Sequence, residues 1–315
     1  MSQTIGFVLV AYDKPQQLLR LTQRLISLYQ NPPIVCHFDF GKNSLEGIEF
    51  PKQVRFVQPH IDTKWGRISC WLAFQAALRE MYQNSDGSDW FTFLSGSDYT
   101  TQPPQAVLDQ LANGGFDAYL DHRPIVYPLI PDPTTQYERH GFKSAGWVPV
   151  AYDRYIAIQI WLPGYSWRRK KPIRIPVGIV RSKSLVSPFN PFSEALRCFG
   201  GDAWITGNRR TAERILAQND TNLAILAHYF TRFAPDESLT HTILCNQPDL
   251  RISADNLRYI DWSIGGHHPK ILGMEDIPRI FASKAHFARK FDLAGGTKVL
   301  DAIDQAVDSA ARLPG

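Results

Sequence analysis

Short apolar runs alternate with helical patterns along the first hundred residues. Ile5–Ala11 is almost continuously apolar, as is typical of a strand that is covered on both faces. Leu18, Leu21, Leu25 and Leu28 follow at steps of three and four, which places them on one face of a helix. Such alternation predicts an α/β fold in which a mainly parallel sheet lies between helical layers.

Capping signals and further patterns extend this prediction along the chain. Asp13 is positioned to cap the first helix, and Pro15 suits its first turn. We expect further strands at 34–40, 54–57 and 90–94, a polar turn at 95–98, and further helices near 68–82, 211–228 and 299–313. The 315 residues are compatible with one large α/β domain or two ordinary ones.

Composition narrows the class of protein. A hydrophobic content of 44% with 20% charged residues excludes a disordered chain or a coiled coil. The net charge, 34 − 30 = +4, suits phosphate-bearing ligands but is too small to indicate a nucleic-acid-binding protein. Four widely spaced cysteines indicate neither a zinc knuckle nor a disulfide framework. No apolar run approaches the roughly 20 residues of a membrane span, and no leader is evident, so we expect a cytoplasmic protein.

Several nucleotide and hydrolase motifs are absent. The chain has no GxxxxGK[ST] loop and no GxGxxG after its first strand, which removes the main support for kinase-type and dinucleotide-binding functions. It also has no GxSxG and no HExxH. No two aspartates are separated by a single residue, so the common Asp-x-Asp metal motif of sugar-nucleotide enzymes is missing.

Five segments, in order, resemble the core-2/I-branching β-1,6-N-acetylglucosaminyltransferase family, which also contains peptide O-xylosyltransferases. They are IGFVLVAYDKPQQLLRL at 5–21, CHFDF at 36–40, WGRISCWLAFQAAL followed by FTFLSGSDYT within 65–100, PDESLTHTIL at 235–244, and LRYIDWSIGGHHPKIL with FARKFD within 257–292. The eukaryotic members carry a membrane anchor, a stem and disulfides. This sequence shows none of these and resembles a soluble, bacterial-type member.

The resemblance implies a GT-A-type fold in a single large domain and an inverting, metal-independent transferase with no cofactor. It would move N-acetylglucosamine or xylose from a UDP-sugar to a glycan or glycoconjugate. Residues 1–125 would form a nucleotide-sugar-binding half, 126–292 an acceptor-binding and catalytic half, and 293–315 a C-terminal helix. Two alternatives stay open: a metal-dependent enzyme whose cation is held by isolated carboxylates such as Asp98, and a non-catalytic carbohydrate-binding protein on the same fold.

The proposed reaction needs a base, and Glu237 is the candidate. The family's base glutamate lies in a Pro-Asp-Glu motif such as the one at 235–237. From the residues alone, the neighbouring carboxylate of Asp236 can raise one of the two pKa values. The alternative is an ordinary helix start, with Asp236 as cap and Glu237 in the first turn.

The leaving diphosphate needs positive charge, and the family supplies it from two late basic residues. One matches Lys290, the other falls near Lys270, and Arg289 is a third candidate because arginine binds phosphate through two hydrogen bonds. The alternative is a solvated helix end that contains Lys284, Arg289 and Lys290.

The donor nucleotide is expected at the carboxyl ends of the first strands. By resemblance, Ala11, Asp39, Trp65 and Asp98 belong to this part of the site. Each aspartate could equally serve as a turn or cap residue, and Trp65 could serve only in packing.

Two further features concern the acceptor and its surroundings. Asp202 and Trp204 resemble the family's acceptor-lining segment, where Trp204 could stack on a sugar ring or simply be buried. Asp236 is expected beside them. A basic run, Arg168, Arg169, Lys170 and Lys171, is either a solvated loop or a contact with an anionic acceptor, a lipid diphosphate or the inner membrane face.

Overall fold

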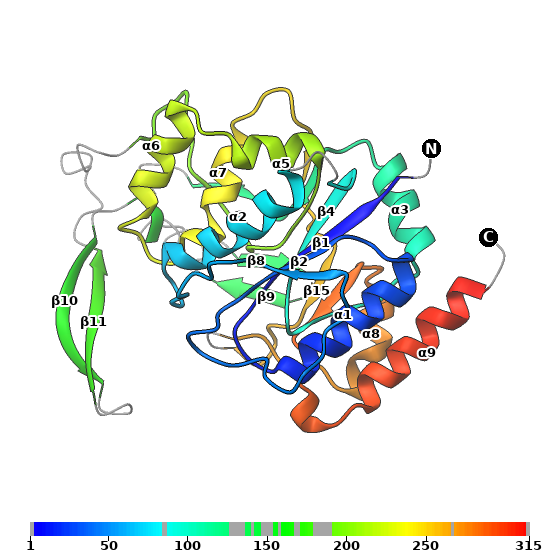
Figure 1. Ribbon diagram of the computed structural model, residues 1–315. Helices are drawn as coiled ribbons and strands as arrows, with labels where there is room; N and C mark the ends of the chain where they lie inside the picture. Colours follow the sequence, from blue (N-terminus) through cyan, green and yellow to red (C-terminus); the bar gives the residue numbers. More distant parts are fainter. Residues whose placement is uncertain are drawn as a thin grey trace.

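A seven-stranded mixed sheet runs through the middle of the molecule in the computed structural model (Figure 1). The structure describes residues 3–83, 87–125, 136–139, 142–145, 154–156, 159–166, 171–178, 191–265 and 268–312. In spatial order the strands are β14 (Ile252–Ser253), β6 (Ala118–Leu120), β13 (Ile205–Asn208), β4 (Trp90–Ser95), β1 (Ile5–Ala11), β2 (Ile34–Phe38) and β3 (Val54–Phe56).

Most of this sheet is parallel. β1 pairs in parallel with β2 and β4, and β2 pairs in parallel with β3, whereas β13 is antiparallel to both of its neighbours. Strands that run in the same direction bring their carboxyl ends to one edge of the sheet. The first four predicted strands are confirmed within two residues at each end.

Helices cover both faces of the sheet. They are α1 (Pro15–Tyr29), α2 (Ile68–Tyr82), α3 (Pro104–Asn113), α5 (Arg209–Leu216), α6 (Asp220–Tyr229), α7 (Leu239–Cys245), α8 (Ile277–Ala282) and α9 (Lys298–Arg312). Side chains of β1 alternate between two cores: Val8 packs with α2, α5 and α7, while Phe7 and Leu9 pack with α1, α3 and α9. The predicted α/β sandwich is therefore confirmed.

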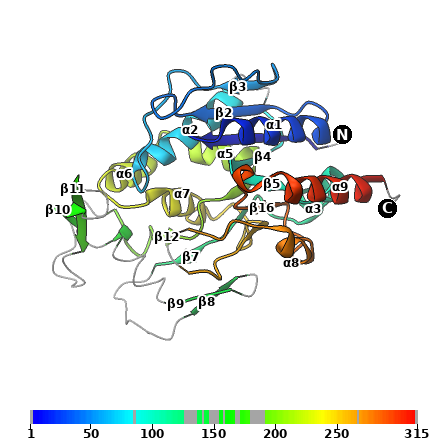
Figure 2. The same ribbon diagram turned by 90° about the horizontal axis from the view of Figure 1, so that it is seen from below.

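Four smaller sheets complete the described structure. β15 (Arg258–Ile260), β16 (Phe287–Arg289) and β5 (Asp98–Thr100) form a three-stranded sheet, and β12 (Phe199–Gly200) pairs with β7 (Arg123–Pro124). Two hairpins, β8 (Gln136–Arg139) with β9 (Phe142–Ala145) and β10 (Gln159–Ser166) with β11 (Lys171–Gly178), stand apart from the main sheet (Figure 2). Lys171 of the basic run opens β11, whereas Arg168, Arg169 and Lys170 lie outside the described residues.

Two details of the helices differ from the prediction. Asp13 does not cap α1: Lys14 occupies that position in a left-handed conformation, and its carbonyl accepts hydrogen bonds from the amides of Gln17 and Leu18. The predicted helix at 211–228 is two helices, because Ala217 is extended and the Asn219 side chain caps a new helix by accepting from the Asn222 amide. Among the described residues, no helix is long and apolar enough to cross a membrane.

The C-terminal helix α9 lies along α1, as Figures 1 and 2 both show. Asp304 on α9 is 2.8 Å from the guanidinium groups of both Arg20 and Arg24, and it accepts a hydrogen bond of 2.9 Å from the Tyr99 hydroxyl. Among the residues that the structure describes, Asp308 pairs only with Arg24. Asp304 thus joins α9 to α1 and β5.

We expect Asp304→Ala to lower the free energy of unfolding by about 1.5–3 kcal/mol, because two charged partners and a buried tyrosine lose their acceptor. Urea denaturation measures this change. Asp308→Ala is the control: its side chain is 42% exposed, so its removal should cost less than about 1 kcal/mol. Equal losses in the two variants would contradict the central role of Asp304.

Candidate active site

The candidate site lies where β1, β2 and β4 end. Ala11 closes β1, and its carbonyl accepts a 3.0 Å hydrogen bond from the amide of Asp39, which directly follows β2. Ser95 closes β4. Ligands of open α/β sheets bind at this carboxyl edge. The structure therefore brings the predicted donor residues Ala11 and Asp39 together.

Asp39 is a buried, ionised carboxylate. One of its oxygens accepts from both the amide (2.8 Å) and the hydroxyl (2.6 Å) of Thr63, and the Lys42 ammonium is 3.3 Å away. Burial alone would raise the pKa of Asp39, but the hydrogen bonds from Thr63 and Lys42 outweigh it and lower the pKa. The same Lys42 ammonium lies over the half-exposed ring of Tyr12, 4.5 Å from its centre.

One cluster of possible metal ligands lies beside Asp39. Ligand atoms of Asp39, His60 and Asp62 are within 4.8 Å of one another. Both oxygens of Asp39 already accept hydrogen bonds, one from the Gly41 amide and the other from Thr63, and a lysine ammonium is close to the second. This donor set fits a hydrogen-bonded turn better than a cation site.

Trp65 links the donor residues to the candidate base. Its ring is 68% exposed and contacts Phe233 edge to face at 5.2 Å. The Ala234 amide donates to the Gly66 carbonyl at 3.0 Å. Gly66 has a φ of +70°, and a Cβ there would lie 2.5 Å from the Phe233 ring, so only glycine allows this close approach. The segment before Pro235 is thereby fixed against Trp65.

The Pro-Asp-Glu motif forms a separate 3₁₀ turn, η2 (Pro235–Glu237), and not the start of α7. Ser238 occupies the N-terminal flank of α7, so the alternative in which Asp236 caps this helix is wrong. Asp236 Oδ1 is buried and has no hydrogen-bond partner among the described residues. Burial raises the pKa of this carboxyl group.

Glu237 has the properties of a general base. Its Oε2 accepts from Arg154 Nη1 at 2.9 Å and from the Tyr155 hydroxyl at 3.0 Å. Protein surrounds the carboxylate, although 38% of the side-chain surface stays accessible. Burial, followed by the charge of Asp236, raises the pKa of Glu237 to about 7, against the opposing effects of Arg154 and Tyr155. A carboxylate with such a pKa can exchange a proton near neutrality.

The charge of Asp202 acts on both the candidate base and Arg289 of the late motif. The Gly201 amide donates to the Glu237 carbonyl at 2.9 Å. The charge of Asp202 helps to raise the pKa of Glu237, after burial and Asp236. For Arg289, burial lowers the pKa, and Asp98, Asp202 and Tyr12 oppose this effect. These couplings place Glu237, Asp202, Arg289 and Tyr12 in one electrostatic neighbourhood.

Asp98 has a structural role that differs from the predicted one. Its carboxylate forms a 2.7 Å ion pair with Arg258, and both side chains are 0% exposed. It also accepts from the amide and the hydroxyl of Ser95. A carboxylate sealed in this way cannot reach a donor sugar or a metal ion, which is a correction to its predicted place among the donor residues.

Trp204 lies in the predicted region, but its ring contacts protein groups. The Arg289 guanidinium lies over it at 4.2 Å, and Phe93 is 5.1 Å from it. Arg258 approaches the same ring at 5.3 Å. Trp204 therefore holds two arginines in place. Its stacking on an acceptor sugar stays a prediction.

Lys290 directly follows strand β16, so the alternative of a solvated helix end is wrong for Arg289 and Lys290. Burial, with the nearby charges of Arg289 and Lys14, lowers the pKa of Lys290. No described residue forms a hydrogen bond or ion pair with its ammonium. The backbone around it is fixed by Gln17, whose buried amide bonds the Phe291 carbonyl and the Leu293 amide.

Lys270 is close to Lys290 in the backbone but has partners of its own. The Leu272 amide donates to the Lys290 carbonyl at 2.8 Å, so the two segments lie side by side. The Lys270 ammonium is 2.7 Å from Asp276 and 3.0 Å from Glu275. The hydrogen bond with Asp276 raises the pKa of Lys270. Its predicted contact with the diphosphate would require it to leave these carboxylates.

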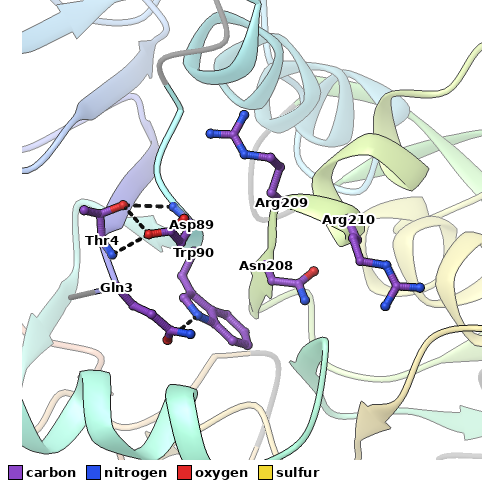
Figure 3. Close-up of a pocket in the computed structure, with 7 residues that line it drawn as sticks. All are labelled: Gln3, Thr4, Asp89, Trp90, Asn208, Arg209 and Arg210. Atoms are coloured by element: carbon purple, nitrogen blue, oxygen red, sulfur yellow. Dashed lines mark hydrogen bonds between the residues drawn. The ribbon is translucent and has the colours of Figure 1, made fainter. Parts of the chain in front are cut away.

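A separate pocket of about 520 Å³ lies at the opposite, amino-terminal edge of the sheet (Figure 3). It is lined by Gln3, Thr4, Asp89, Trp90, Asn208, Arg209 and Arg210. The side chains that line it are bonded to protein groups: Asp89 accepts from Thr4, and Arg210 pairs with Asp117 and Asp249. None of the predicted site residues lies there.

Comparisons with known proteins bear on this geometry. A model of the Core-2/I-Branching enzyme family matches residues 167–283. A β-glucuronosyltransferase of Arabidopsis thaliana, GlcAT14A, is 30% identical over 69% of this chain, and xylosyltransferase 1 of Mus musculus is 24% identical over 95% of it. The chain carries a Core-2/I-Branching enzyme domain.

The similarity to these relatives covers only part of their length. The chain spans 42% of the Arabidopsis glucuronosyltransferase and 30% of the mouse xylosyltransferase. Among solved structures, the apo WbbM bifunctional glycosyltransferase aligns with 98% of this chain and 52% of its own at a TM-score of 0.36 and 9% identity. A superposition this loose supports no conclusion.

Several residues of this candidate site carried no signal in the sequence. Arg154 and Tyr155 lie 83 and 82 positions before Glu237, in a stretch without a motif. Arg258 belongs to a family-like segment, but only its complete burial distinguishes it from the other arginines. Lys42 and Tyr12 follow the ends of two strands, and only this position in the chain indicates a role at the site.

The Arg258–Asp98 pair gives a prediction about stability. Asp98→Asn should lower the free energy of unfolding by about 3–5 kcal/mol, because it leaves a buried guanidinium without its counter-charge. Chemical denaturation of the variant measures this loss. Asp39→Asn is a matched control, since Asp39 is equally buried but its cation, Lys42, is 38% exposed; about 1–3 kcal/mol is expected. Normal stability of Asp98→Asn, with weakened donor binding, would restore Asp98 to the donor site.

Proposed function

We propose that this chain is an inverting glycosyltransferase that moves a sugar from a UDP-sugar to a hydroxyl group of a glycan or glycoconjugate. The observation that carries the proposal is Glu237: an accessible carboxylate with a pKa raised to about 7, which is coupled to Asp202, and Asp202 is coupled in turn to Arg289. The similarity to proteins named xylosyltransferase and glucuronosyltransferase supports the same class of reaction.

In the proposed reaction, Glu237 accepts the proton of the acceptor hydroxyl as that oxygen attacks the anomeric carbon. The bond between the anomeric carbon and the UDP oxygen breaks on the opposite face, which inverts the configuration. Asp236 and Asp202, whose charges act on Glu237, would line the acceptor region together with Trp204. Residues 126–292 would thus supply the base and bind the acceptor.

UDP leaves with an additional negative charge, which Lys290 is placed to stabilise. Its ammonium is partly buried, has no protein partner among the described residues and lies near Lys14 and Arg289. A preorganised charge in a partly dry site stabilises the transition state more than a solvated one does. Lys270 would be a second cation if a diphosphate drew it away from Asp276. Arg289 would contribute through its field, since its guanidinium is packed on Trp204.

The donor nucleotide would bind in the half formed by residues 1–125, with Asp39 on the uridine or ribose and Trp65 as a wall. N-acetylglucosamine and xylose are the predicted donor sugars. The names of the relatives favour xylose and add glucuronic acid as a third candidate. A cytoplasmic location, with a peripheral membrane contact through the basic run at 168–171, belongs to the same proposal.

We further propose that the transfer needs no metal ion and no cofactor. The metal-dependent alternative relied on isolated carboxylates such as Asp98, and Asp98 is closed off by Arg258. The non-catalytic alternative is disfavoured by the raised pKa of Glu237, because a merely structural carboxylate gains nothing from a site that opposes its charge.

A UDP-release screen tests this function. Wild-type protein with UDP-xylose, UDP-N-acetylglucosamine or UDP-glucuronic acid and a panel of glycan acceptors should release UDP, and excess EDTA should reduce the rate at most a few-fold. Glu237→Gln removes the proton acceptor and should lower kcat by roughly 10²–10⁴. Glu213→Gln, an exposed position on α5, is the control. Full activity of Glu237→Gln, or complete loss with EDTA that Mn²⁺ restores, would refute the mechanism.

The leaving-group assignment gives a separate prediction. Lys290→Ala should lower kcat and weaken UDP binding, with a loss of transition-state stabilisation of about 2–4 kcal/mol. Kinetics and calorimetric titration with UDP measure the two effects. Lys284→Ala carries the same charge change at an exposed position six residues earlier and should have little effect. Similar, small effects from both variants would assign the diphosphate to other cations.

A further inference from the structure

The two oxygens of the Glu237 carboxylate have different surroundings. Oε2 receives both hydrogen bonds, from Arg154 Nη1 at 2.9 Å and from the Tyr155 hydroxyl at 3.0 Å. Among the described residues, no donor reaches Oε1. Because 38% of the side chain is accessible, a hydroxyl group of a ligand can approach that second oxygen.

Tyr155 is held rigidly. Its side chain is 0% exposed and packs against Tyr229 at 6.3 Å, and its own carbonyl forms a 2.7 Å hydrogen bond with His228 Nε2. Gly200 lies so close that a Cβ there would be 3.2 Å from the Tyr155 ring. Burial raises the pKa of Tyr155 well above its ordinary value, so its hydroxyl stays a hydrogen-bond donor at every pH at which the enzyme would work.

Arg154 is positioned by an aromatic contact as well as by Glu237. Its guanidinium lies 5.4 Å from the centre of the Phe233 ring, and Phe233 in turn contacts Trp65. The side chain is 29% exposed, so its charge is only partly screened by water. Arg154 thus connects the base to the segment that bears the proposed donor wall.

Opposing forces determine whether Glu237 carries a charge. Burial, Asp236 and Asp202 favour the protonated form, whereas Arg154 and Tyr155 favour the ionised form. These four groups come from the 3₁₀ turn, the segment before β13, and residues 154–155. Without the arginine and the tyrosine, nothing in this set would keep the carboxylate ready to take a proton.

We propose that Arg154 and Tyr155 are positioning residues which hold Oε2, keep Glu237 ionised and leave Oε1 as the atom that accepts the proton of the acceptor hydroxyl. This inference rests on the proposed function. In the step itself, the O–H proton passes to Oε1, the freed electron pair forms the new bond to the anomeric carbon, and the bond to UDP breaks.

The test is the pH dependence of kcat/KM for UDP release, measured with the full chain. In the wild type, the rate should fall as the pH drops through about 7, because Glu237 becomes protonated. Arg154→Gln and Tyr155→Phe remove groups that favour the ionised form, so each should raise the pKa of Glu237. The fall in rate at low pH, the acidic limb of the profile, should therefore move to higher pH. A shift of about one unit is expected for Arg154→Gln, and a smaller one for Tyr155→Phe. Arg154→Lys, which keeps the charge, should restore part of the shift.

Tyr229→Phe is the matched control. Tyr229 is equally buried and adjacent to Tyr155, but its hydroxyl bonds Ser238 instead of Glu237, so its removal should leave the acidic limb in place. Carbon-13 NMR titration of the Glu237 carboxyl group in protein labelled with [5-¹³C]glutamate, assigned with Glu237→Gln, should show the same ordering of variants in the absence of any substrate.

The outcomes separate the two proposals. If Glu237→Gln is inactive but Arg154→Gln and Tyr155→Phe leave both the limb and the NMR midpoint within 0.2 pH unit (roughly the error of such titrations), this inference is wrong and the proposed function stands. If Glu237→Gln retains full activity, or the wild type transfers none of the sugars tested, the proposed function fails first. Equal shifts in Tyr229→Phe and Tyr155→Phe would assign the effect to packing and overturn the positioning role.

Discussion

The buried ion pair between Arg258 and Asp98 is the interaction on which the site depends. Asp98 belongs to β5, Arg258 to β15, and the neighbouring Arg289 to β16, so each strand of the three-stranded sheet contributes one charged group. Arg258 also donates to the Phe93 carbonyl on β4. The pair thus joins the small sheet to the main sheet and brings the end of β16, with Lys290, to the carboxyl edge of β1.

A second constraint operates at Glu237, where the needs of chemistry oppose those of stability. A carboxylate whose pKa is raised in the folded state binds protons that the unfolded chain would release, so its ionisation weakens the fold as the pH rises from about 4.5 to 7. Asp236 adds to this cost in stability, because its buried Oδ1 has no hydrogen-bond partner among the described residues. The turn packs against both α2 and α7, and a hydrogen bond from Trp71 to Thr240 joins these two helices.

Much of the fold could be predicted from local pattern. In β1, α1 and α2, the spacing of apolar residues in the sequence matches the side chains that are buried in the structure. The prediction failed at two helix ends. Lys14, and not Asp13, occupies the cap position of α1, and Asn219 caps a second helix where one continuous helix was expected. Among the site residues, position after a strand pointed to Ala11 and Asp39. Asp98 satisfied the same rule but found a buried partner 160 residues away, and no local pattern reveals such a partner.

The contact between α1 and α9 has a consequence for how the protein is made. Arg20 and Arg24 pair with carboxylates 280 to 284 positions later in the chain, and Gln17 bonds the Phe291 carbonyl 274 positions later. On the ribosome, α1 therefore emerges 274 to 284 residues before the groups on Phe291 and Asp304 that hold it. Contacts of such long sequence separation are costly to form and slow folding.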